Sequence, residues 1–455
     1  MNKEIFREYD IRGIVKDDLT PEVVENIGRA FGTVVKRDGG EKVTIGHDAR
    51  ESCGELLKNL SKGIMGAGID VISIGLVPTP LLYYSLHHLN PDGGVMITGS
   101  HNPPEFNGFK LNLGKSSIFG DGIRALSGMI EKEDFESGAG SMSEADVIED
   151  YLSMVKEKIS LKRGMKIVID SGNGCGGIFA PALMRDLGCD VVELFCDVDG
   201  SFPNHHPDPT VPDNLKDLIS KVKETGADAG FAYDGDADRI GVVDEKGGIL
   251  FGDQLMMIFA RDILGRKPGS AIVYDVKCSQ NLEDDIKNHG GRPLINATGH
   301  SLIKARLSKE GAELAGEMSA HIFFKDGYFG YDDAIFATAR FLKIMSETDM
   351  KVSKFLADTP TVFNTPEIRI DCPDNVKFDL VADITKYFKN SYEVVDIDGA
   401  RVNFENGWGL IRASNTQPVL VLRFEAQSEA RLEEIKKIIY DKLSSYPSQK
   451  GMAMP

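Results

Sequence analysis

The chain has 455 residues, of which 42% are hydrophobic and 27% are charged, an ordinary composition for a folded chain in water. One hydrophobic core does not grow to this size, so we expect three or four domains. The net charge of −18 disfavours nucleic acids and anionic membranes as partners.

The apolar segments and the cysteines of the chain further restrict the class of protein. No apolar run reaches the length of a membrane span, and the first residues carry no hydrophobic signal core. The six cysteines are scattered without a CxxC pair. This usage favours a reducing, cytoplasmic compartment and argues against a disulfide framework or a zinc site.

Three stretches of the chain share one plan, in which strands alternate with helical segments. Each begins with an apolar strand that runs into a polar turn, and a second and a third strand follow. We expect the first strands within 41–52, 165–177 and 270–282, the second within 66–80, 187–200 and 289–301, and the third within 93–104, 227–239 and 311–324. Such βαβ units build mostly parallel sheets covered by helices.

The recurrence predicts an α/β fold: three similar mixed-sheet α/β domains plus a C-terminal α+β domain around one central cleft. The expected domains are 1–148, 149–253, 254–358 and 359–455, with a proline-containing linker at 356–367. Ligands of open α/β sheets bind outside the carboxyl ends of the strands, so the polar loops that follow the three third strands should face that cleft.

The last domain reads differently from the repeated units. We expect strands within 365–371, 399–405, 407–414 and 418–426, and helices at 374–390 and 428–446. Asn406 and Gly407 are typical of a tight hairpin turn between two of these strands. In the final helix, Leu432, Ile435, Ile439 and Leu443 form one apolar stripe.

Asp234, Asp236 and Asp238 alternate along "YDGDADRIG" and predict a metal site. Their carboxylates repel one another unless a cation lies between them, and oxygen ligands suit Mg²⁺ or Ca²⁺. An EF-hand loop would also place a glutamate at Glu245, but Arg239 stands where that loop needs glycine. The remaining alternative is a solvated acidic turn.

Ser100 follows a buried strand in "VMITGSHNPPEFNGFKL" and precedes two prolines, so we expect its hydroxyl to be exposed. A turn serine is the ordinary alternative. A serine-hydrolase elbow is disfavoured because Asn102 replaces its second glycine and prolines follow. A turn at Asn107 and Gly108 would bring Lys110 back towards Ser100, an arrangement that suits phosphoryl chemistry.

Two further motifs complete the candidate site. Glu317, Ser319 and His321 alternate in "GEMSAHIFF" and would point one way on an extended segment, which suits a polyol or a solvent-facing strand. "RASNTQP", from Arg412, lies between two strands and is typical of an anion cradle or of a polar hairpin loop. These motifs together indicate an enzyme that acts on phosphosugars: a possible metal-binding triad, a serine, residues that could bind a polyol and a loop that could bind an anion.

These motifs resemble those of the α-D-phosphohexomutase superfamily, in its phosphomannomutase/phosphoglucomutase branch. "TGSHNP" is similar to the phosphoserine loop, "DGDADR" to the metal loop, "GEMSAH" to the sugar loop and "RASNT" to the phosphate loop, in the family's order. The resemblance covers essentially the whole chain. Many members carry glycine where Ala320 stands, and Met318 favours the mannose/glucose branch over phosphoglucosamine mutases.

The resemblance implies a role for each matching residue. Ser100 would carry a phosphoryl group and, with Asp234, Asp236 and Asp238, would bind Mg²⁺. The expected catalytic residues are Ser100 and the residues that would border its phosphoryl group, with His321 as the acid/base on the sugar side. The bordering residues are His101, Lys110, Arg12 and Arg239. The expected substrate-binding residues are Tyr9, Lys277, His300, Glu317, Ser319, Arg412, Ser414, Asn415, Thr416 and Arg423.

The resemblance also implies the reaction. Hexose 1-phosphate and hexose 6-phosphate, of mannose or glucose, would interconvert through a phosphoserine and a hexose 1,6-bisphosphate, which would also be the activator. The alternatives are a phosphoglucosamine mutase, a metal-dependent sugar-phosphate hydrolase and a non-catalytic sugar-phosphate sensor. The expected partner is a small phosphosugar, and the sequence leaves monomer or weak dimer open.

Overall fold

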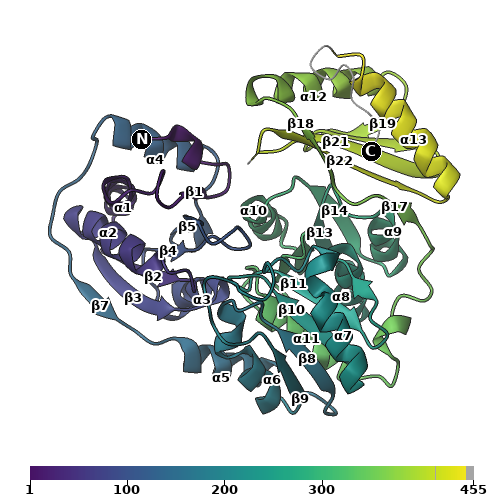
Figure 1. The fold of residues 1–455 in the computed structure, drawn as a ribbon, viewed down its shortest axis with the longest axis horizontal. Coiled ribbons are helices and arrows are strands. Elements are labelled where there is room, and N and C mark those ends of the chain that lie inside the picture. Colours follow the sequence, from purple (N-terminus) through teal and green to yellow (C-terminus); the bar gives the residue numbers. More distant parts are fainter. Residues whose placement is uncertain (416, 447–455) are drawn as a thin grey trace.

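The computed structural model describes residues 1–415 and 417–446 and contains four β-sheets, each packed against helices (Figure 1). We number the four sheet-and-helix units as domains one to four in chain order. In the part of the chain described, no helix combines the length and apolar character needed to cross a bilayer.

The sheet of the first domain has seven strands in the order β1-β5-β4-β2-β3-β7, with β6 paired to β5. β4, β2, β3 and β7 run parallel, and β5 and β1 are antiparallel additions at one side. The strands are β1 Ile11–Ile14, β2 Lys42–His47, β3 Asp70–Leu76, β4 Gly93–Ile97, β5 Phe106–Leu113, β6 Ser116–Ser117 and β7 Met142–Glu144. The helices are η1 Lys3–Ile5, α1 Pro21–Arg37, α2 Cys53–Gly66, α3 Thr79–His88 and α4 Asp121–Glu131.

The second domain repeats this plan with the sheet order β12-β11-β10-β8-β9, in which β10, β8 and β9 are parallel. Its strands are β8 Lys166–Asp170, β9 Asp190–Leu194, β10 Ala229–Tyr233, β11 Ile240–Asp244 and β12 Ile249–Leu250. Its helices are α5 Ile148–Lys158, η2 Cys175–Ile178, α6 Ala180–Asp186, η3 Pro212–Leu215 and α7 Lys216–Thr225.

The third domain has the sheet order β14-β13-β15-β16, with β16 antiparallel to β15. Its strands are β13 Ala271–Asp275, β14 Arg292–Asn296, β15 Leu314–Gly316 and β16 Ile322–Phe324. Its helices are α8 Gly252–Arg266, α9 Gln280–Asn288, α10 His300–Glu310, α11 Ala334–Ser346 and η4 Val352–Lys354. The predicted mixed-sheet α/β class is confirmed for all three domains.

The fourth domain is an antiparallel sheet covered by two helices, as the predicted α+β class requires. Its strands are β17 Phe363–Asn364, β18 Ile368–Asp371, β19 Glu393–Val395, β20 Ala400–Phe404, β21 Gly407–Ala413 and β22 Val419–Ala426. Its helices are α12 Asp374–Phe388 and α13 Glu429–Leu443. In Figure 1 this domain lies beside β13, β14 and α10 of the third domain.

The apolar cores explain how the four domains are joined. One continuous core extends from Leu81 in α3 through Phe231 in β10 to Phe341 in α11, so it links the first three domains. The fourth domain has a separate core, in which Ile435 and Ile439 of the predicted stripe are fully buried. The fourth domain shares one small apolar cluster with the third, in which Trp408 and Leu410 of β21 pack with Val276. Its contacts with Tyr9 and Lys277 are made by polar and charged groups, which are described below.

Two local predictions are wrong in detail. Phe404 pairs with Gly407, so the hairpin turn is Glu405 and Asn406, with Asn406 at φ +62°. Asn107 and Gly108 do not form a turn but lie inside β5, where Gly108 pairs with Arg12. The chain reverses earlier, between β4 and β5, because the two prolines after Ser100 interrupt the strand.

Candidate active site

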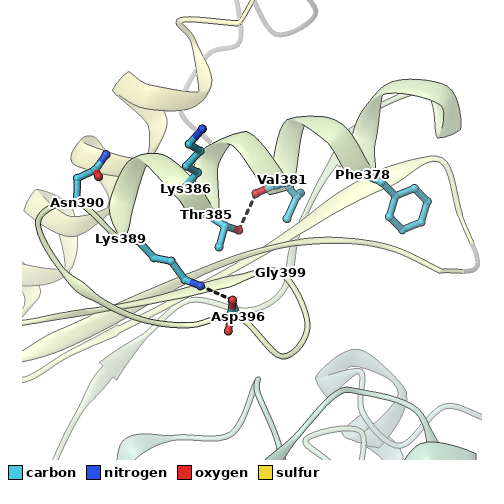
Figure 2. A pocket seen from close by; sticks show the side chains of 9 residues that line it. Phe378, Val381, Thr385, Lys386, Lys389, Asn390, Asp396 and Gly399 are labelled. Atoms are coloured by element: carbon cyan, nitrogen blue, oxygen red, sulfur yellow. Dashed lines mark hydrogen bonds and ion pairs between the residues drawn. The ribbon is translucent and has the colours of Figure 1, made fainter.

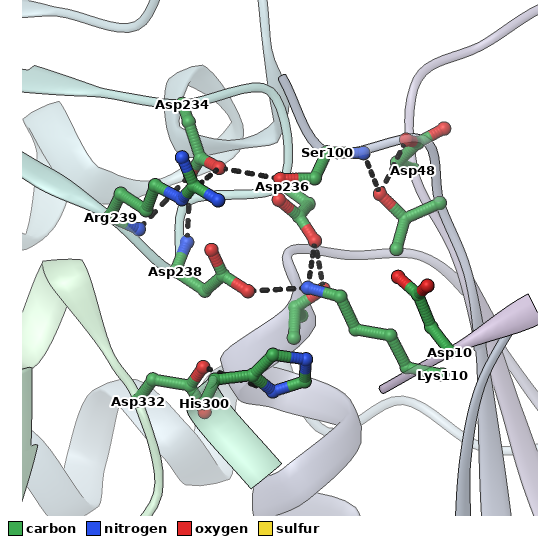
Figure 3. A network of polar contacts seen from close by, with 12 residues as sticks. Asp10, Asp48, Ser100, Lys110, Asp234, Asp236, Asp238, Arg239, His300 and Asp332 are labelled. Carbon is green, nitrogen blue, oxygen red and sulfur yellow. Dashed lines mark hydrogen bonds and ion pairs between the residues drawn. The ribbon is translucent and has the colours of Figure 1, made fainter. Parts of the chain in front are cut away.

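Three loops that follow β4, β10 and β15 meet in what we call the central site, and Figure 3 shows the first two at Ser100 and at Asp234 to Arg239. The Ser100 hydroxyl, on the first loop, donates a hydrogen bond of 2.8 Å to Asp234 Oδ2 on the second. His321, after the third, lies with Nε2 at 3.1 Å from Asp238 Oδ1. The carboxyl ends of the central strands of three sheets thus bring together residues more than 200 positions apart, as the topology predicts.

Each of the three loops contains a non-glycine residue in the left-handed region. These are Ser100 at φ +50°, Ala237 at φ +55° and Ala320 at φ +65°. Such conformations cost roughly 1–2 kcal/mol for a residue with a side chain and persist only where the surroundings hold them. The central site is therefore built from strained turns rather than from relaxed loops.

We expect Ala320→Gly to stabilise the protein slightly. Glycine relieves the left-handed strain but raises the entropy of the unfolded chain, which leaves a net gain of at most about 1 kcal/mol. Ala382→Gly, on the exposed face of α12, is the control and should cost about 1 kcal/mol. Urea unfolding of both variants measures the two signs, and a loss of stability in Ala320→Gly contradicts the strain assignment.

The Ser100 loop is held by a buried ion pair that the sequence analysis missed. Arg50 and Asp48 are each 1% exposed at the side chain and contact each other at 3.2 Å. The Arg50 guanidinium donates to the carbonyls of Ser100, Asn102, Pro103 and Phe106. Asp48 accepts from the Thr98 hydroxyl and the Gly99 backbone N–H. The sequence signal for this ion pair was the aspartate and the arginine of "GHDAR", which follow β2.

Burial of Ser100 is a second departure from expectation. The residue is 2% exposed rather than exposed, because the loop of the second domain covers it and Gly235 packs on its carbonyl. Its hydroxyl also lies 3.1 Å from His101 Nδ1. Ser100 does lie beside the acidic loop, but its hydroxyl is enclosed between two domains.

The acidic triad has the chemistry of a cation site. Asp234, Asp236 and Asp238 are fully buried, and one oxygen of each lies within 4.8 Å of the others. Burial, together with the charges of its two neighbours, raises the pKa of Asp234 well above its ordinary value. Asp236 Oδ1 is buried without a hydrogen-bond partner among the described residues. A hard divalent cation such as Mg²⁺ satisfies both features.

The EF-hand alternative is not supported. Glu245 turns away from the triad and accepts hydrogen bonds from the backbone and the hydroxyl of Ser353, at 3.1 and 2.5 Å. The triad residues instead occupy the turn between β10 and β11. A surface acidic turn is also excluded by the complete burial of the three carboxylates.

Lys110 on β5 lies against the triad. Its ammonium contacts Asp236 Oδ2 at 2.8 Å and also contacts Asp238 (Figure 3). Burial alone lowers the pKa of Lys110, but the charges of Asp236 and Asp238 outweigh it and raise the pKa well above its ordinary value. Lys110 therefore stays a cation beside the acidic triad.

Two arginines and a histidine border the same place. Arg12 donates to Asn102 in the serine loop at 2.9 Å and pairs with Asp10 at 2.6 Å. The Arg239 side chain donates to His321 Nε2 at 3.2 Å. Burial, with the nearby arginines, lowers the pKa of His101 well below its ordinary value, so this imidazole is neutral near pH 7. The arginines supply the positive charge that an anionic ligand needs.

The sugar-loop residues are brought together by a turn and not by an extended segment. Residues 317–321 lie between β15 and β16, and the left-handed Ala320 lets the chain reverse. Glu317 Oε2 is 2.8 Å from His321 Nδ1, and the Ser319 hydroxyl is 3.3 Å from the same nitrogen. Burial lowers the pKa of His321, but Asp238 and Glu317 together raise it to about 9.

His300, at the start of α10, lies beside this loop. Its ring centroid is 5.7 Å from that of His321 and 6.3 Å from that of Tyr9. Its Nδ1 is 3.8 Å from Asp332 Oδ2, a buried carboxylate that also contacts Lys304. Sequence reasoning did not single out Asp332 or Lys304, because neither stands in one of the four motifs.

The fourth domain reaches the site through its polar loop. Asn415 donates to the Tyr9 hydroxyl at 2.9 Å, and that hydroxyl donates to the Thr298 carbonyl at 2.6 Å. The first, third and fourth domains therefore meet at one phenol. Arg412 pairs with Asp398 at 3.0 Å, and Asp398 accepts the backbone N–H of Thr298, so this motif lies against the loop that precedes α10.

The other predicted substrate-binding residues near this loop make separate contacts. The Ser414 hydroxyl accepts from the Gln417 backbone N–H, and Thr416 lies outside the described residues. Arg423 is 4% exposed, with its guanidinium 3.9 Å from Asp253 of the third domain. Lys277 pairs with Glu367 of the fourth domain at 2.7 Å.

A groove of about 580 Å³ lies elsewhere on the fourth domain, between α12 and the segment before β20 (Figure 2). It is lined by Phe378, Val381, Ala382, Thr385, Lys386, Lys389, Asn390, Asp396 and Gly399. None of these residues belongs to the four motifs. The groove is therefore separate from the central site.

The fold and the site define a class of proteins with four such domains. The phosphoglucomutase/phosphomannomutase models match along the chain: α/β/α domain I at residues 3–137, domain II at 149–248, domain III at 251–363 and the C-terminal domain at 367–442. The chain belongs to the phosphoglucomutase/phosphomannomutase family, within the α-D-phosphohexomutase superfamily.

Individual relatives agree along the full length. A phosphomannomutase/phosphoglucomutase of Pseudomonas aeruginosa is 46% identical, over 98% of this chain and 96% of the relative. A phosphoglucomutase of Neisseria meningitidis is 45% identical, over 98% of both chains. The crystal structure of a phosphoglucomutase/phosphomannomutase family protein of Burkholderia thailandensis is 43% identical, with a TM-score of 0.93 over 100% of both chains.

Proposed function

We propose that this protein is a phosphohexomutase, an isomerase that interconverts the 1-phosphate and the 6-phosphate of mannose, glucose or both. The observation that carries the proposal is the Ser100 hydroxyl at 2.8 Å from Asp234, a member of a buried acidic triad that Lys110 also contacts. Relatives with 45–46% identity over nearly the whole chain are named phosphoglucomutase or phosphomannomutase, which supports this reading over a hydrolase or a sensor.

The reaction transfers one phosphoryl group twice. Phosphoserine 100 gives its phosphoryl to the free hydroxyl of the hexose phosphate, and the proton of that hydroxyl goes to a base. The hexose 1,6-bisphosphate then reorients, and its other phosphoryl returns to the Ser100 oxygen. One phosphate ester forms as another breaks in each half, so hexose 1-phosphate becomes hexose 6-phosphate without release of inorganic phosphate.

The residues around Ser100 divide this work. Lys110, Arg12 and Arg239 offset the negative charge of the moving phosphoryl group. His321, held between Asp238 and Glu317, is the candidate acid/base for the sugar hydroxyl. With a pKa of about 9 it is an imidazolium near pH 7, so it is poised to give a proton to the sugar oxygen that loses a phosphoryl group, and it must first lose its proton to act as the base in the other half-reaction. Mg²⁺, held by Asp234, Asp236, Asp238 and an oxygen on Ser100, supplies electrostatic stabilisation of the transferred group when bound.

Ser100 must be phosphorylated before the first turnover. We propose hexose 1,6-bisphosphate as the activator, because it is the phosphoryl donor that the reaction itself forms.

Three further proposals concern the cellular compartment, the ligand and the domain boundaries. The six cysteines are scattered along the chain without a CxxC pair, which supports a reducing, cytoplasmic setting. The proposed partner is a small phosphosugar, and the proposed domain division is 1–148, 149–253, 254–358 and 359–455.

A coupled assay tests the function. Mannose, glucose and glucosamine 1-phosphates are supplied side by side with Mg²⁺ and a trace of glucose 1,6-bisphosphate, and 6-phosphate formation is followed. Turnover of the mannose or glucose compound without phosphate release supports the proposal. Phosphate release indicates a hydrolase, binding without turnover indicates a sensor, and a preference for glucosamine 1-phosphate indicates a phosphoglucosamine mutase.

We expect Arg412→Ala to raise KM with a smaller effect on kcat. The guanidinium would grip the non-reacting phosphate in both ground and transition states, and losing one charge-assisted contact costs about 1.5–3 kcal/mol. Arg431→Ala, on the surface of α13, is the control and should leave KM unchanged. Unchanged binding of hexose phosphates to Arg412→Ala refutes the role of this loop.

A further inference from the structure

Arg412, proposed above to bind the non-reacting phosphate, and Lys277, an expected substrate-binding residue whose charge interacts with that of Arg412, are each paired with a carboxylate of the fourth domain. Lys277 Nζ lies 2.7 Å from Glu367 Oε1, and Arg412 Nε lies 3.0 Å from Asp398 Oδ2. The two pairs are coupled, because the charge of Arg412 also lowers the pKa of Glu367. The two pairs balance each other's charge, so a phosphate dianion that binds Lys277 and Arg412 competes with the carboxylates already paired with them.

The two carboxylates differ in how firmly they are held. Asp398 is 11% exposed at the side chain and also accepts the Thr298 backbone N–H at 3.0 Å, which fixes it in place. Glu367 is 29% exposed and follows the short strand β17 at the start of the fourth domain. Its second oxygen lies 3.7 Å from the exposed Arg369, which offers it an alternative partner. Glu367 is therefore the carboxylate that can leave.

Lys277 explains why an exchangeable anion is needed. The residue is 6% exposed, and it also pairs with the buried Asp275, but at the longer distance of 3.8 Å. A buried ammonium that keeps only this longer contact is less well stabilised than one that also contacts Glu367 at 2.7 Å, so a replacement anion favours departure of a phosphate from Lys277. Glu367 supplies that replacement from within the chain.

We propose that Glu367 is an internal counter-anion that exchanges with the substrate's non-reacting phosphate on Lys277. This inference rests on the proposed function and deepens it. A mutase must release the non-reacting phosphate so that the bisphosphate can reorient, and its affinity for that phosphate therefore has to be limited. Glu367 sets the limit: it opposes phosphate binding and assists phosphate departure, and it acts through Lys277 rather than on the reacting atoms.

Glu367→Gln tests the exchange, with glucose 6-phosphate as the probe in calorimetric titrations at constant ionic strength. The neutral amide competes less well for Lys277, so the Kd should fall roughly threefold to tenfold. In turnover, KM and kcat should fall together, because the bound phosphate leaves more slowly. Asp379→Asn removes the same charge from the exposed face of α12 and should leave the Kd unchanged.

A double-mutant cycle with Lys277→Met separates exchange from a general charge effect. In the Lys277→Met background, Glu367→Gln should no longer change the Kd. Glu367→Asp, which keeps the charge on a shorter side chain, should give an intermediate Kd, and it preserves the test if the glutamine variant folds poorly. An unchanged or higher Kd in Glu367→Gln overturns the inference, as does a fall that persists without Lys277 or that appears in Asp379→Asn.

The outcomes are distinguishable from failure of the proposed function. Binding of glucose 6-phosphate is measured without turnover, so the Glu367 effect is observed whether or not the sugar phosphates interconvert. An inactive protein that shows the predicted cycle overturns the mutase proposal and supports the exchange on Lys277. An active mutase whose Kd does not respond to Glu367→Gln overturns the exchange alone.

Discussion

Ser100→Ala should lose nearly all mutase activity, by about 10³-fold or more, because the acceptor and donor of the phosphoryl group is removed. The parent, incubated with glucose 1,6-bisphosphate, should carry one phosphate, and peptide mapping should place it on Ser100. The variant should carry none. Intact-mass spectrometry and the coupled assay measure the two results independently.

Stability separates this effect from misfolding. The hydroxyl donates one hydrogen bond, to Asp234, so its removal should cost only about 1 kcal/mol in the free energy of unfolding. Ser116→Ala, on the exposed strand β6 of the same domain, is the matched control and should keep full activity and phosphorylation. Normal bisphosphate-activated turnover in Ser100→Ala is incompatible with the proposed mechanism.

Asp236→Asn should weaken Mg²⁺ binding by at least about tenfold and lower kcat correspondingly, without unfolding the chain. The substitution removes a metal ligand but relieves repulsion, since the charge of Asp236 contributes to the raised pKa of Asp234. Lys110 keeps its contact with Asp238. The melting temperature of chelator-treated protein, titrated with Mg²⁺, measures the affinity apart from activity.

Glu245→Gln is the control for this prediction, because it tests the position that an EF-hand would use. Its carboxylate contacts Ser353 and not the triad, so the Mg²⁺ midpoint should not move. An unchanged Mg²⁺ midpoint in Asp236→Asn would show that the triad does not bind the ion. A shifted midpoint in Glu245→Gln alone would restore the EF-hand reading.

The contacts of the fourth domain are of two kinds. Its main core is separate from the core that links the first three domains, but Trp408 and Leu410 also pack with Val276 of the third domain. Its contacts with Tyr9 and Lys277 are polar, through Asn415 and Glu367. These polar contacts can be exchanged for ligand contacts at little cost in buried apolar area, whereas a shared apolar cluster resists separation.

Much of the fold could be predicted from the sequence because the signals are local. Apolar strands that end in polar turns mark β4, β10 and β15, and the stripe that includes Ile435 and Ile439 marks α13. Alternating carboxylates at Asp234, Asp236 and Asp238 likewise need no partner to be noticed. Periodicity and charge repulsion act over a few residues, so they can be read without a three-dimensional structure.

Tertiary structure alone decided what encloses and holds the motifs. The sequence indicates a serine at the end of β4, but its burial depends on a loop 134 residues away. Likewise, Asp48 and Arg50 are two charged residues separated by Ala49, and only the structure shows that four carbonyls of the serine loop accept hydrogen bonds from the guanidinium. The pairing of Lys277 with Glu367 joins two domains across 90 positions. Burial and ion pairing depend on distances in space, which only the packing of the domains sets.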